Sequence, residues 1–255
     1  MEEKRRPNHF LAIQVTDKKI KQNVRELQNV ILEKEKHLSH AMVKTERLHL
    51  TLGVYHLEDQ ERVAQAAEAL DRFHSKLNIS DFTPPSLNVS MVGHFNHQVL
   101  FASVTEDEGL DVFNNLVNYV KKSLETLTGI RRIEPTHYEE KKTTYFGKQT
   151  AESIQLCSMT KPMTESGYYH TDGFVATDDR YTPHITIGKM STKLRKLGIR
   201  RIEPTHYEEK KTTYFGKQTA ESIQLCSMTK PMTESGYYHV EHEIRFLVSD
   251  DSEDQ

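Results

Sequence analysis

Two five-residue segments of the chain share one pattern of a histidine, an apolar residue, a threonine, a second apolar residue and a glycine. They are His-Leu-Thr-Leu-Gly at residues 49–53 and His-Ile-Thr-Ile-Gly at residues 184–188. Side chains alternate between the two faces of a β-strand, so the histidine and the threonine lie on one face and the apolar residues on the other. The pattern predicts two strands that each present an imidazole and a hydroxyl, with Gly53 and Gly188 leaving room beside them.

Two such strands facing each other would suit the chemistry of a phosphodiester. One imidazole can act as general base on an attacking hydroxyl or water and the other, protonated, can act as general acid, because histidine titrates near neutral pH. The threonine hydroxyls can donate hydrogen bonds to the non-bridging oxygens, where charge builds up. We therefore predict His49 and His184 as the catalytic pair and Thr51 and Thr186 as phosphate ligands, with no metal and no other cofactor. The sequence leaves open which histidine is the acid and which is the base.

Simpler interpretations of these residues exist. A histidine on a half-buried strand is often only a hydrogen-bonded polar residue, and a zinc site would need further ligands, whereas the other histidines show no His-Glu-x-x-His spacing. The two cysteines, Cys157 and Cys226, are too few for a disulfide framework or a cysteine zinc cluster. Tyr181, beside the second motif, and Phe95 are candidates for stacking on a base, with plain packing as the alternative.

The surrounding sequence predicts the elements that position these motifs. Strands are expected at 9–15 and 47–57, helices after the first strand and over 58–77 and 110–127, and a hairpin of 86–95 and 98–104 that turns near Asn96 and His97. The residues expected to face the core from the three helices are Ile20, Val24, Leu27 and Ile31; Val63, Ala66, Ala67 and Leu70; and Val112, Leu116, Val120 and Leu124. The result is an α+β (α/β-like) chain in two comparable halves, each with one motif strand.

One long segment occurs twice, because residues 129–170 are identical to residues 198–239. Repeat architectures use three or more diverged units, so two perfect copies indicate a recent in-frame duplication or an error in the gene model. The second copy runs directly into the alternating strand pattern of 240–246. We therefore expect 198–239 to occupy the native position and 131–170 to form a peripheral excursion.

The predicted organisation is a flexible N-terminus at 1–8, one domain at 9–248 that the duplicated insert 129–170 interrupts, and an acidic tail at 249–255. The formal net charge of −3 gives no sign of a protein that is basic overall. The local basic runs at 4–6 and 193–201 are interpreted as solvated surface, with a weak nuclear import signal as an alternative for the first. No apolar run approaches a membrane span or a signal peptide, so we expect a cytoplasmic or nuclear location and no membrane partner.

The paired motifs resemble those of the two-histidine phosphoesterase superfamily. Within it, PNHFLAIQVTDKKI, HLSHAMVKTERLHLTLGV, YTPHITIGKMS, GIRRIEPTHYE and IQLCSMTKPMTESGYYHVE resemble the central domain of the gamma/delta-type A-kinase anchoring proteins. The likeness covers about residues 7–248 apart from the first copy. It implies a bilobal fold of two pseudo-symmetric sheet-and-helix lobes around a central groove, with His49 and His184 as the catalytic pair.

The resemblance also implies a substrate. It points to metal-independent cleavage of 2′,5′-linked oligoadenylate and to binding of AMP-like nucleotides, with another RNA end or a cyclic phosphate as alternatives. An AMP-binding module or an anchoring scaffold, neither with turnover, would be the competing functions. The anchoring proteins dock an amphipathic C-terminal helix onto a kinase regulatory subunit. Only SDDSEDQ follows Val248, so we do not expect this partner.

Overall fold

A computed structural model of the chain describes residues 6–77, 82–130, 132 and 182–246. All described helices and strands belong to one compact unit, which comprises residues 1–133 and 183–255. None of the helices in these described ranges combines the length and the apolar composition of a transmembrane span.

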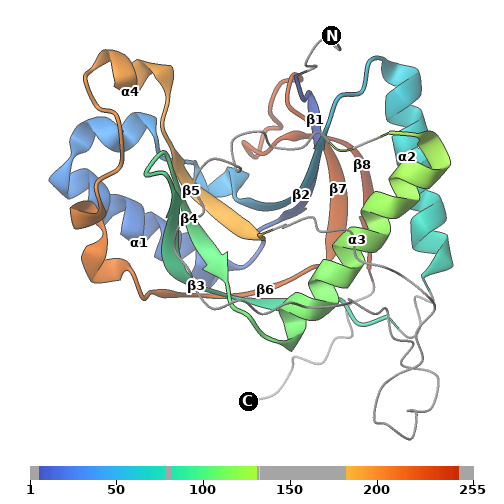
Figure 1. The fold of residues 1–255 in the computed structure, drawn as a ribbon, viewed down its shortest axis with the longest axis horizontal. Helices are drawn as coiled ribbons and strands as arrows, with labels where there is room; N and C mark the ends of the chain where they lie inside the picture. Colours follow the sequence, from blue (N-terminus) through green and yellow to red (C-terminus); the bar gives the residue numbers. More distant parts are fainter. Residues whose placement is uncertain (1–5, 78–81, 131, 133–181, 247–255) are drawn as a thin grey trace, which may run out of the picture. The chain divides into compact units, whose positions relative to one another are not determined.

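The centre of this unit is one eight-stranded antiparallel sheet with the strand order β6-β3-β4-β5-β2-β1-β7-β8 (Figure 1). The motif strands β2 and β5 are its two middle strands, so each half of the sheet has four strands and one motif. This confirms the predicted α+β chain in two comparable halves. The strands are β1 (His9–Gln14), β2 (His49–Tyr55), β3 (Ser86–Phe95), β4 (Val99–Val104), β5 (His184–Lys189), β6 (Tyr214–Thr219), β7 (Ser222–Ser227) and β8 (His239–Arg245).

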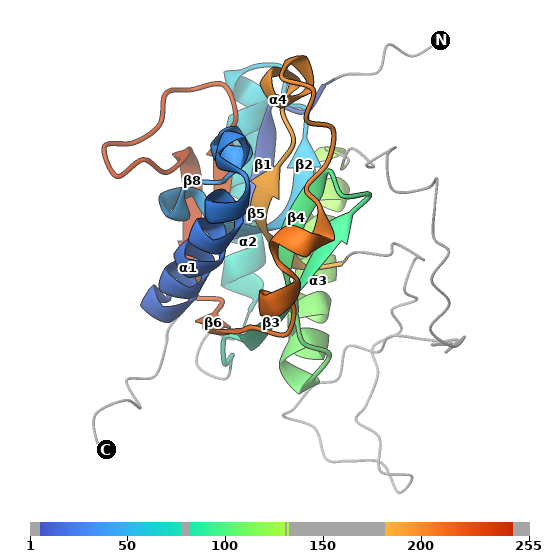
Figure 2. The ribbon, with the colours of Figure 1, turned by 90° about the vertical axis from the view of Figure 1, so that its left-hand side faces the viewer.

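The helices form two groups at opposite ends of the sheet, although the third helix also contacts β3 in the other half. The second and third helices, α2 and α3, pack against each other, and α2 also contacts β8, whereas the first helix, α1, packs against β6 at the opposite edge (Figures 1 and 2). The α-helices are α1 (Lys18–Lys34), α2 (Gln60–Lys76), α3 (Glu108–Thr128) and α4 (Thr192–Lys196), and the short 3₁₀ helices are η1 (Lys36–His40), η2 (Thr45–Arg47), η3 (Pro204–His206) and η4 (Glu208–Lys210).

The predicted core face of α1 is confirmed, because all four of its residues are buried, whereas the faces of α2 and α3 need corrections. In α2, Ala67 is only half-buried, and Ala69 is buried instead. In α3, Val112 is 39% exposed and Phe113 is fully buried. An α-helix turns 100° per residue, so positions four apart drift by 40° at each step and Val112 falls at the edge of the face that Leu116, Val120 and Leu124 define.

The predicted hairpin is confirmed by the pairing of β3 with β4. Asn96 and His97 at its turn have left-handed backbone angles (φ 49° and 56°), and the Gln98 amide donates to the Phe95 carbonyl at 2.8 Å. The turn of this hairpin therefore begins at the residue after Phe95, the last residue of β3.

The second copy of the duplicated segment supplies both β6 and β7, one to each half of the sheet. Its β6 fits closely against α1. Gly216 has a φ of 147°, and a Cβ atom there would lie 2.9 Å from the Ile20 side chain. The Gln218 side chain accepts hydrogen bonds from the Thr16 and Asp17 amides at 2.8 and 3.2 Å. Only a residue without a side chain allows this approach of β6 to the helix.

The first copy is described only at its start. Gly129, with a φ of 66°, caps the C-terminus of α3, and Ile130 is buried. The rest of the predicted excursion at 131–170, the acidic tail and residues 1–5 lie outside the described residues, except for Arg132. Asn8, at the end of the predicted flexible N-terminus, exchanges hydrogen bonds of 2.8 Å with the backbone of Leu57.

Candidate active site

The two motif strands are neighbours in the middle of the sheet and run antiparallel. Their paired residues are Leu50 and Ile185, the apolar residues between the histidine and the threonine of each motif. Both side chains are fully buried. Because directly opposite residues point to the same face of a sheet, the histidines and threonines on either side of this pair share the other face.

Leu50 and Ile185 are the one pair of residues that the two motif strands match directly. If the antiparallel register continues by one residue on each side of this pair, it places His49 opposite Thr186 and Thr51 opposite His184. The two histidines would then be diagonal neighbours, a relation that separates Cα atoms by about 7–8 Å.

Both motif strands contain a β-bulge at the same position. In β2 the extra residue is Leu52, which lies between residues that pair with consecutive residues of β1. In β5 it is Ile187, which lies in the same way opposite β4. The two motifs also share one burial pattern, in which the histidine and threonine are half-buried and the other three residues are buried. The halves of the site are therefore alike in local structure, although their neighbours differ.

The hydrogen bond of His49 fixes its tautomer. Its Nδ1 lies 2.7 Å from the Arg47 carbonyl oxygen, which can only accept, so Nδ1 carries the proton. The neutral ring therefore has its lone pair on Nε2. Burial lowers the pKa of His49 below its usual value, and the nearby charge of His184 lowers it further. Both effects favour the neutral imidazole, which is the form that accepts a proton.

Aromatic rings from both halves of the sheet enclose the two histidines. Around His49 lie Phe10 at 4.9 Å and Tyr238 at 5.5 Å between ring centroids. Around His184 lie Phe95 at 5.0 Å and Phe101 at 5.1 Å. Phe95, predicted as a candidate for base stacking, is thus brought into contact with a predicted catalytic histidine. Tyr181, the other candidate, lies outside the described residues.

The most informative residue that the sequence analysis missed is Tyr238, because it lies in the second copy of the duplicated segment. Its loop joins β7 to β8 and is held at both ends. The Arg47 side chain reaches the Gly236 carbonyl at 3.4 Å, and the Ser227 hydroxyl accepts from the Thr229 and Lys230 amides. The Tyr-Tyr-His run before a predicted strand was a signal, but the same run occurs in both copies.

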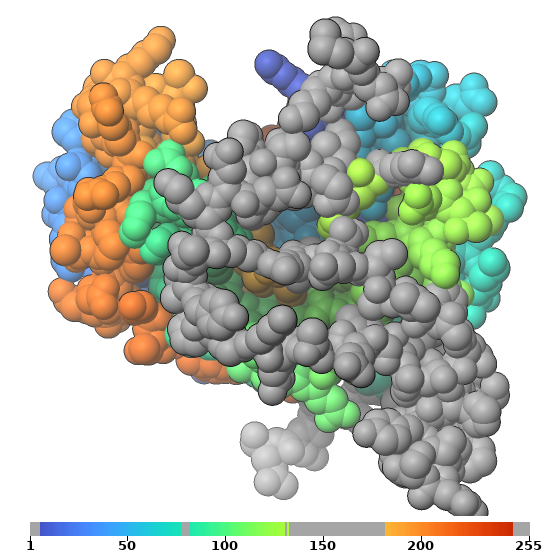
Figure 3. Space-filling view, in the orientation of Figure 1, coloured from blue at the N-terminus to red at the C-terminus, as the bar shows by residue number. Residues whose placement is uncertain are grey.

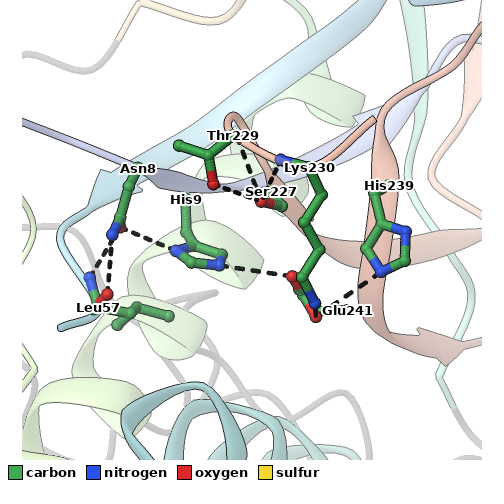
Figure 4. A network of polar contacts seen from close by, with 8 residues as sticks. All are labelled: Asn8, His9, Leu57, Ser227, Thr229, Lys230, His239 and Glu241. Carbon is green, nitrogen blue, oxygen red and sulfur yellow. Dashed lines mark hydrogen bonds and ion pairs between the residues drawn. The ribbon is translucent and has the colours of Figure 1, made fainter. Parts of the chain in front are cut away.

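A buried carboxylate strengthens this anchorage (Figure 4). Glu241 is the extra residue of a bulge in β8, and its side chain is 5% exposed. It forms ion pairs with Lys230 at 2.7 Å and, if these are protonated, with His9 at 3.6 Å and His239 at 3.8 Å. Through His9, the loop that carries Tyr238 is tied to β1. The residue after His9 in this strand is Phe10, which contacts both Tyr238 and His49.

The expectation about the motif glycines is wrong for Gly53. A Cβ atom at this position would lie 2.8 Å from the Tyr55 hydroxyl oxygen, so the Tyr55 side chain fills the space that the glycine leaves. A Cβ atom at Gly188 would meet its nearest neighbours at 3.6 Å, which is ordinary contact. The bulge explains the difference from the simple strand model, because it turns both glycines toward the buried side.

The part of the chain that the structure describes contains no group of three or more His, Cys, Asp or Glu side chains that could hold a metal ion. Cys226 is a free buried thiol, and burial raises its pKa to about 12. Cys157 lies outside the described residues. The metal-free scheme stays a prediction.

Two antiparallel central strands, each with a histidine and a threonine on one face of a two-half α+β sheet, define the class of two-histidine phosphoesterases. Comparison with known families agrees with this class. The chain matches the model of the AKAP7 2'5' RNA ligase-like domain over residues 7–138 and 171–246, and it belongs to this family. Residues 139–170, within the first copy, are outside the match.

The chain is similar to individual proteins at low sequence identity. The human A-kinase anchor protein 7 isoform gamma is 28% identical over 242 residues, which are 93% of this chain and 57% of that protein. The chain thus spans little more than half the length of this relative. Among solved structures, TT0787 of Thermus thermophilus has a TM-score of 0.53 at 17% identity, covering 95% of this chain and 99% of its own. E. coli LigT, complexed with NADP+, has a TM-score of 0.46 at 11% identity, covering 94% and 98%. The family suggests hydrolysis of a phosphodiester.

Proposed function

We propose that the chain is a metal-independent phosphodiesterase that cleaves 2′,5′-linked oligoadenylate or a closely related RNA phosphodiester. The observation that carries this proposal is the pairing of Leu50 with Ile185, which gathers both histidines and both threonines on one face of the sheet. The family's description as 2'5' RNA ligase-like supports the 2′,5′ linkage.

In the proposed mechanism His49 is the general base. Its Nδ1 donates to the Arg47 carbonyl, so the lone pair on Nε2 takes the proton from the attacking hydroxyl or water. The oxygen then forms its bond to phosphorus. His184, protonated, gives its proton to the leaving oxygen as the phosphorus–oxygen bond breaks. The net result is transfer of one proton from His184 and gain of one by His49, and exchange with water resets the pair.

The threonines and aromatic rings have supporting roles in this proposal. Thr51 and Thr186 donate to the non-bridging phosphate oxygens, because they flank the Leu50–Ile185 pair on the face of the sheet that also carries the two histidines. Phe95, in contact with His184, offers a flat face to a base next to the cleaved bond. Tyr181 precedes the second motif by three residues and is proposed for the same role.

The experiment that tests the proposal is incubation of the purified protein with 2′,5′-linked oligoadenylate in EDTA, followed by chromatography of the products. Release of adenosine monophosphate at a rate that EDTA leaves unchanged is expected, because no step uses a metal. Activity that disappears in EDTA and returns with a divalent ion would show a metal mechanism. Tight binding of the oligonucleotide or of AMP with no product would show a binding module.

The pH dependence of the reaction tests the role of His49. The acid limb of kcat/KM reports the pKa of the base in the free enzyme. Since burial lowers this pKa, the limb is expected below about 6.5, the ordinary value for histidine. The base must be deprotonated to act, so activity persists at lower pH than an exposed histidine would allow and is lost as pH falls through the lowered pKa.

Tyr238 provides a test of the cause. Tyr238→Ala removes a ring that packs on His49 and admits water, so the acid limb is expected to move up toward about 6.5. Tyr238→Phe keeps the ring and should keep the limb in place. Tyr169→Ala, at the identical position of the first copy, is the matched control and should leave the profile unchanged. A limb that stays in place in Tyr238→Ala, or that moves equally in Tyr169→Ala, would contradict this role.

The name of the human relative favours a second candidate function, which is docking onto a kinase regulatory subunit. This chain spans 57% of that relative, so docking, a function of the whole relative, comes to this chain only as a proposal. Titration of the protein with purified regulatory subunit tests this function independently of the cleavage assay, and saturable binding would support it.

A further inference from the structure

A run of positive charge begins at the last residue of β5, the strand that carries His184. Residues 189–201, which we call the basic segment, contain six lysines and arginines and no aspartate or glutamate. The cationic residues are Lys189, Lys193, Arg195, Lys196, Arg200 and Arg201. Because the whole chain has a net charge of −3, these cations are gathered locally and do not reflect a generally basic protein.

These side chains are exposed and largely without acidic partners. The segment includes α4 and stands on the surface of the described unit, in orange at the upper left of Figure 3. Among the described residues, only Arg201 of the six pairs with a carboxylate, that of Glu203 at 2.6 Å. Exposed cations that lack acidic partners are available to a polyanion.

Part of the segment is built into an open pocket with the tip of the β3–β4 hairpin. The pocket is lined by Gln98, Arg195 and Arg200. The Arg195 guanidinium donates to the Gln98 side-chain oxygen at 3.1 Å, and the Gln98 side-chain amide donates to the Arg200 carbonyl at 2.5 Å. These bonds hold one arginine side chain and the backbone of the other beside the pocket, with guanidinium groups that can bind phosphate.

The pocket lies close to the candidate active site along the chain. Gln98 is three residues beyond Phe95, which contacts His184. Three residues span at most about 11 Å, so the pocket is within a few nucleotides of the reacting phosphate. Two stacked imidazoles, His94 and His97, with ring centroids 3.7 Å apart, add flat surfaces at the same hairpin tip. Cations beside flat rings are typical of surfaces that bind single-stranded nucleic acid.

We infer that the basic segment and the hairpin tip bind the phosphates of a single-stranded RNA that extends beyond the cleaved bond. The inference rests on the proposed function and narrows its substrate to an oligonucleotide longer than a dinucleotide. A membrane surface or an acidic protein would also attract cations, but neither accounts for their position at the end of the strand that carries His184.

The test compares a dinucleotide with a 12-nucleotide single strand, both with one 2′,5′ bond at the same end. In the variant Arg195→Gln/Arg200→Gln, the KM for the 12-nucleotide substrate is expected to rise at least about 10-fold with kcat unchanged, and the KM for the dinucleotide to stay the same. Each phosphate contact on a single strand contributes about 0.7 to the slope of log affinity against log salt, so the slope should fall by about 1.4. Lys18→Gln/Lys76→Gln removes the same charge from exposed helix positions and should change neither value.

Binding measured without turnover separates this inference from the proposed function. In a His49→Ala background, fluorescence anisotropy with a labelled 12-nucleotide RNA should show the same loss of affinity on changing the two arginines. This result would stand even if the wild-type protein cleaved nothing. The inference would be overturned by equal losses of affinity in the arginine and lysine variants, or by an equal loss for the dinucleotide. Binding to phosphatidylserine vesicles is measured in parallel. If the arginine variant lost only vesicle binding and kept RNA binding, the inference would also be overturned.

Discussion

Replacing His49 or His184 with alanine is expected to reduce cleavage to the background rate. Each imidazole performs one proton transfer in the proposed mechanism, and general acid–base catalysis of this kind contributes about 10²–10⁴-fold to the rate. The fold should be retained, because the motif side chains that are fully buried are the apolar ones, such as Leu50 and Ile185. The measurements are kcat/KM on 2′,5′-oligoadenylate and thermal unfolding of each variant.

Variants of the two threonines and of a control histidine are needed to interpret this result. Thr51→Val and Thr186→Val remove one donor each and should cost roughly 10²–10³-fold, as observed for single oxyanion donors. His37→Ala is the matched control, because its side chain is 66% exposed and it lies in η1. Full activity in His49→Ala or His184→Ala, with the control unchanged, would refute the assigned pair.

A substrate with an activated leaving group distinguishes the acid from the base. The nitrophenolate of a nitrophenyl phosphodiester leaves without being protonated. This substrate should therefore restore much of the activity of His184→Ala and little of that of His49→Ala. The opposite pattern would exchange the two roles. It would also mean that the Nδ1–H tautomer and lowered pKa of His49 do not decide its function.

The predictions that succeeded depend on local periodicity. The alternation in the two motifs correctly placed Leu50 and Ile185 in the core, and the mixed three- and four-residue spacing placed the buried face of α1. Both patterns arise from the geometry of a single element, which a sequence records directly. The same reasoning failed at Val112, where one residue of drift on a long helix moved the expected face away from Phe113.

The rest of the candidate site depends on contacts between distant elements. Phe10 was unreadable as a site residue because β1 is apolar on both faces, so its sequence does not show which face meets His49. The tautomer of His49 depends on a backbone carbonyl, which carries no sequence signal. Neither the bulges in β2 and β5 nor the filling of the Gly53 space by Tyr55 follows from strand alternation, because a bulge breaks that alternation.

Tyr238 shows a different limit. The sequence around Tyr238 is identical to that around Tyr169, so secondary-structure propensity could not show which copy contributes to the site. Connectivity was the only guide, and it pointed to the copy that continues into the last strand. In the structure that copy provides β6, β7 and the ring against His49.

Deleting residues 198–239 is expected to abolish folding unless the identical first copy crosses over into the vacated place in the sheet, whereas deleting 139–170 should preserve both stability and activity. The first deletion removes β6 and β7 together with their buried side chains, among them Phe215, Ile223 and Leu225. At about 1.5–3 kcal/mol each, these three alone contribute roughly 5–9 kcal/mol, comparable with the whole stability of a domain. The second deletion removes only residues outside the family match and leaves every described helix and strand in place.

The starting point of the second deletion matters. Removing 129–170, the whole first copy, would also remove Gly129, which caps α3, and the buried Ile130. That variant is expected to unfold at a lower temperature than the 139–170 deletion, because burial of an isoleucine side chain is worth about 1.5–3 kcal/mol. Equal unfolding temperatures for the two deletions would contradict a structural role for these two residues.

Matched substitutions in the full-length chain test the placement of the copies without any deletion. Gly216→Val forces a side chain into the space of Ile20 at a φ of 147°, so it should lower the unfolding temperature strongly. Gly147→Val makes the same change in the identical sequence of the first copy, and we propose that it has little effect, because we expect that copy to be the peripheral one. Similar losses in both variants would mean that the two copies exchange places in the sheet. A loss confined to Gly147→Val would mean that the first copy holds the native position, and the assignment of Tyr238 to the candidate site would then fail with it.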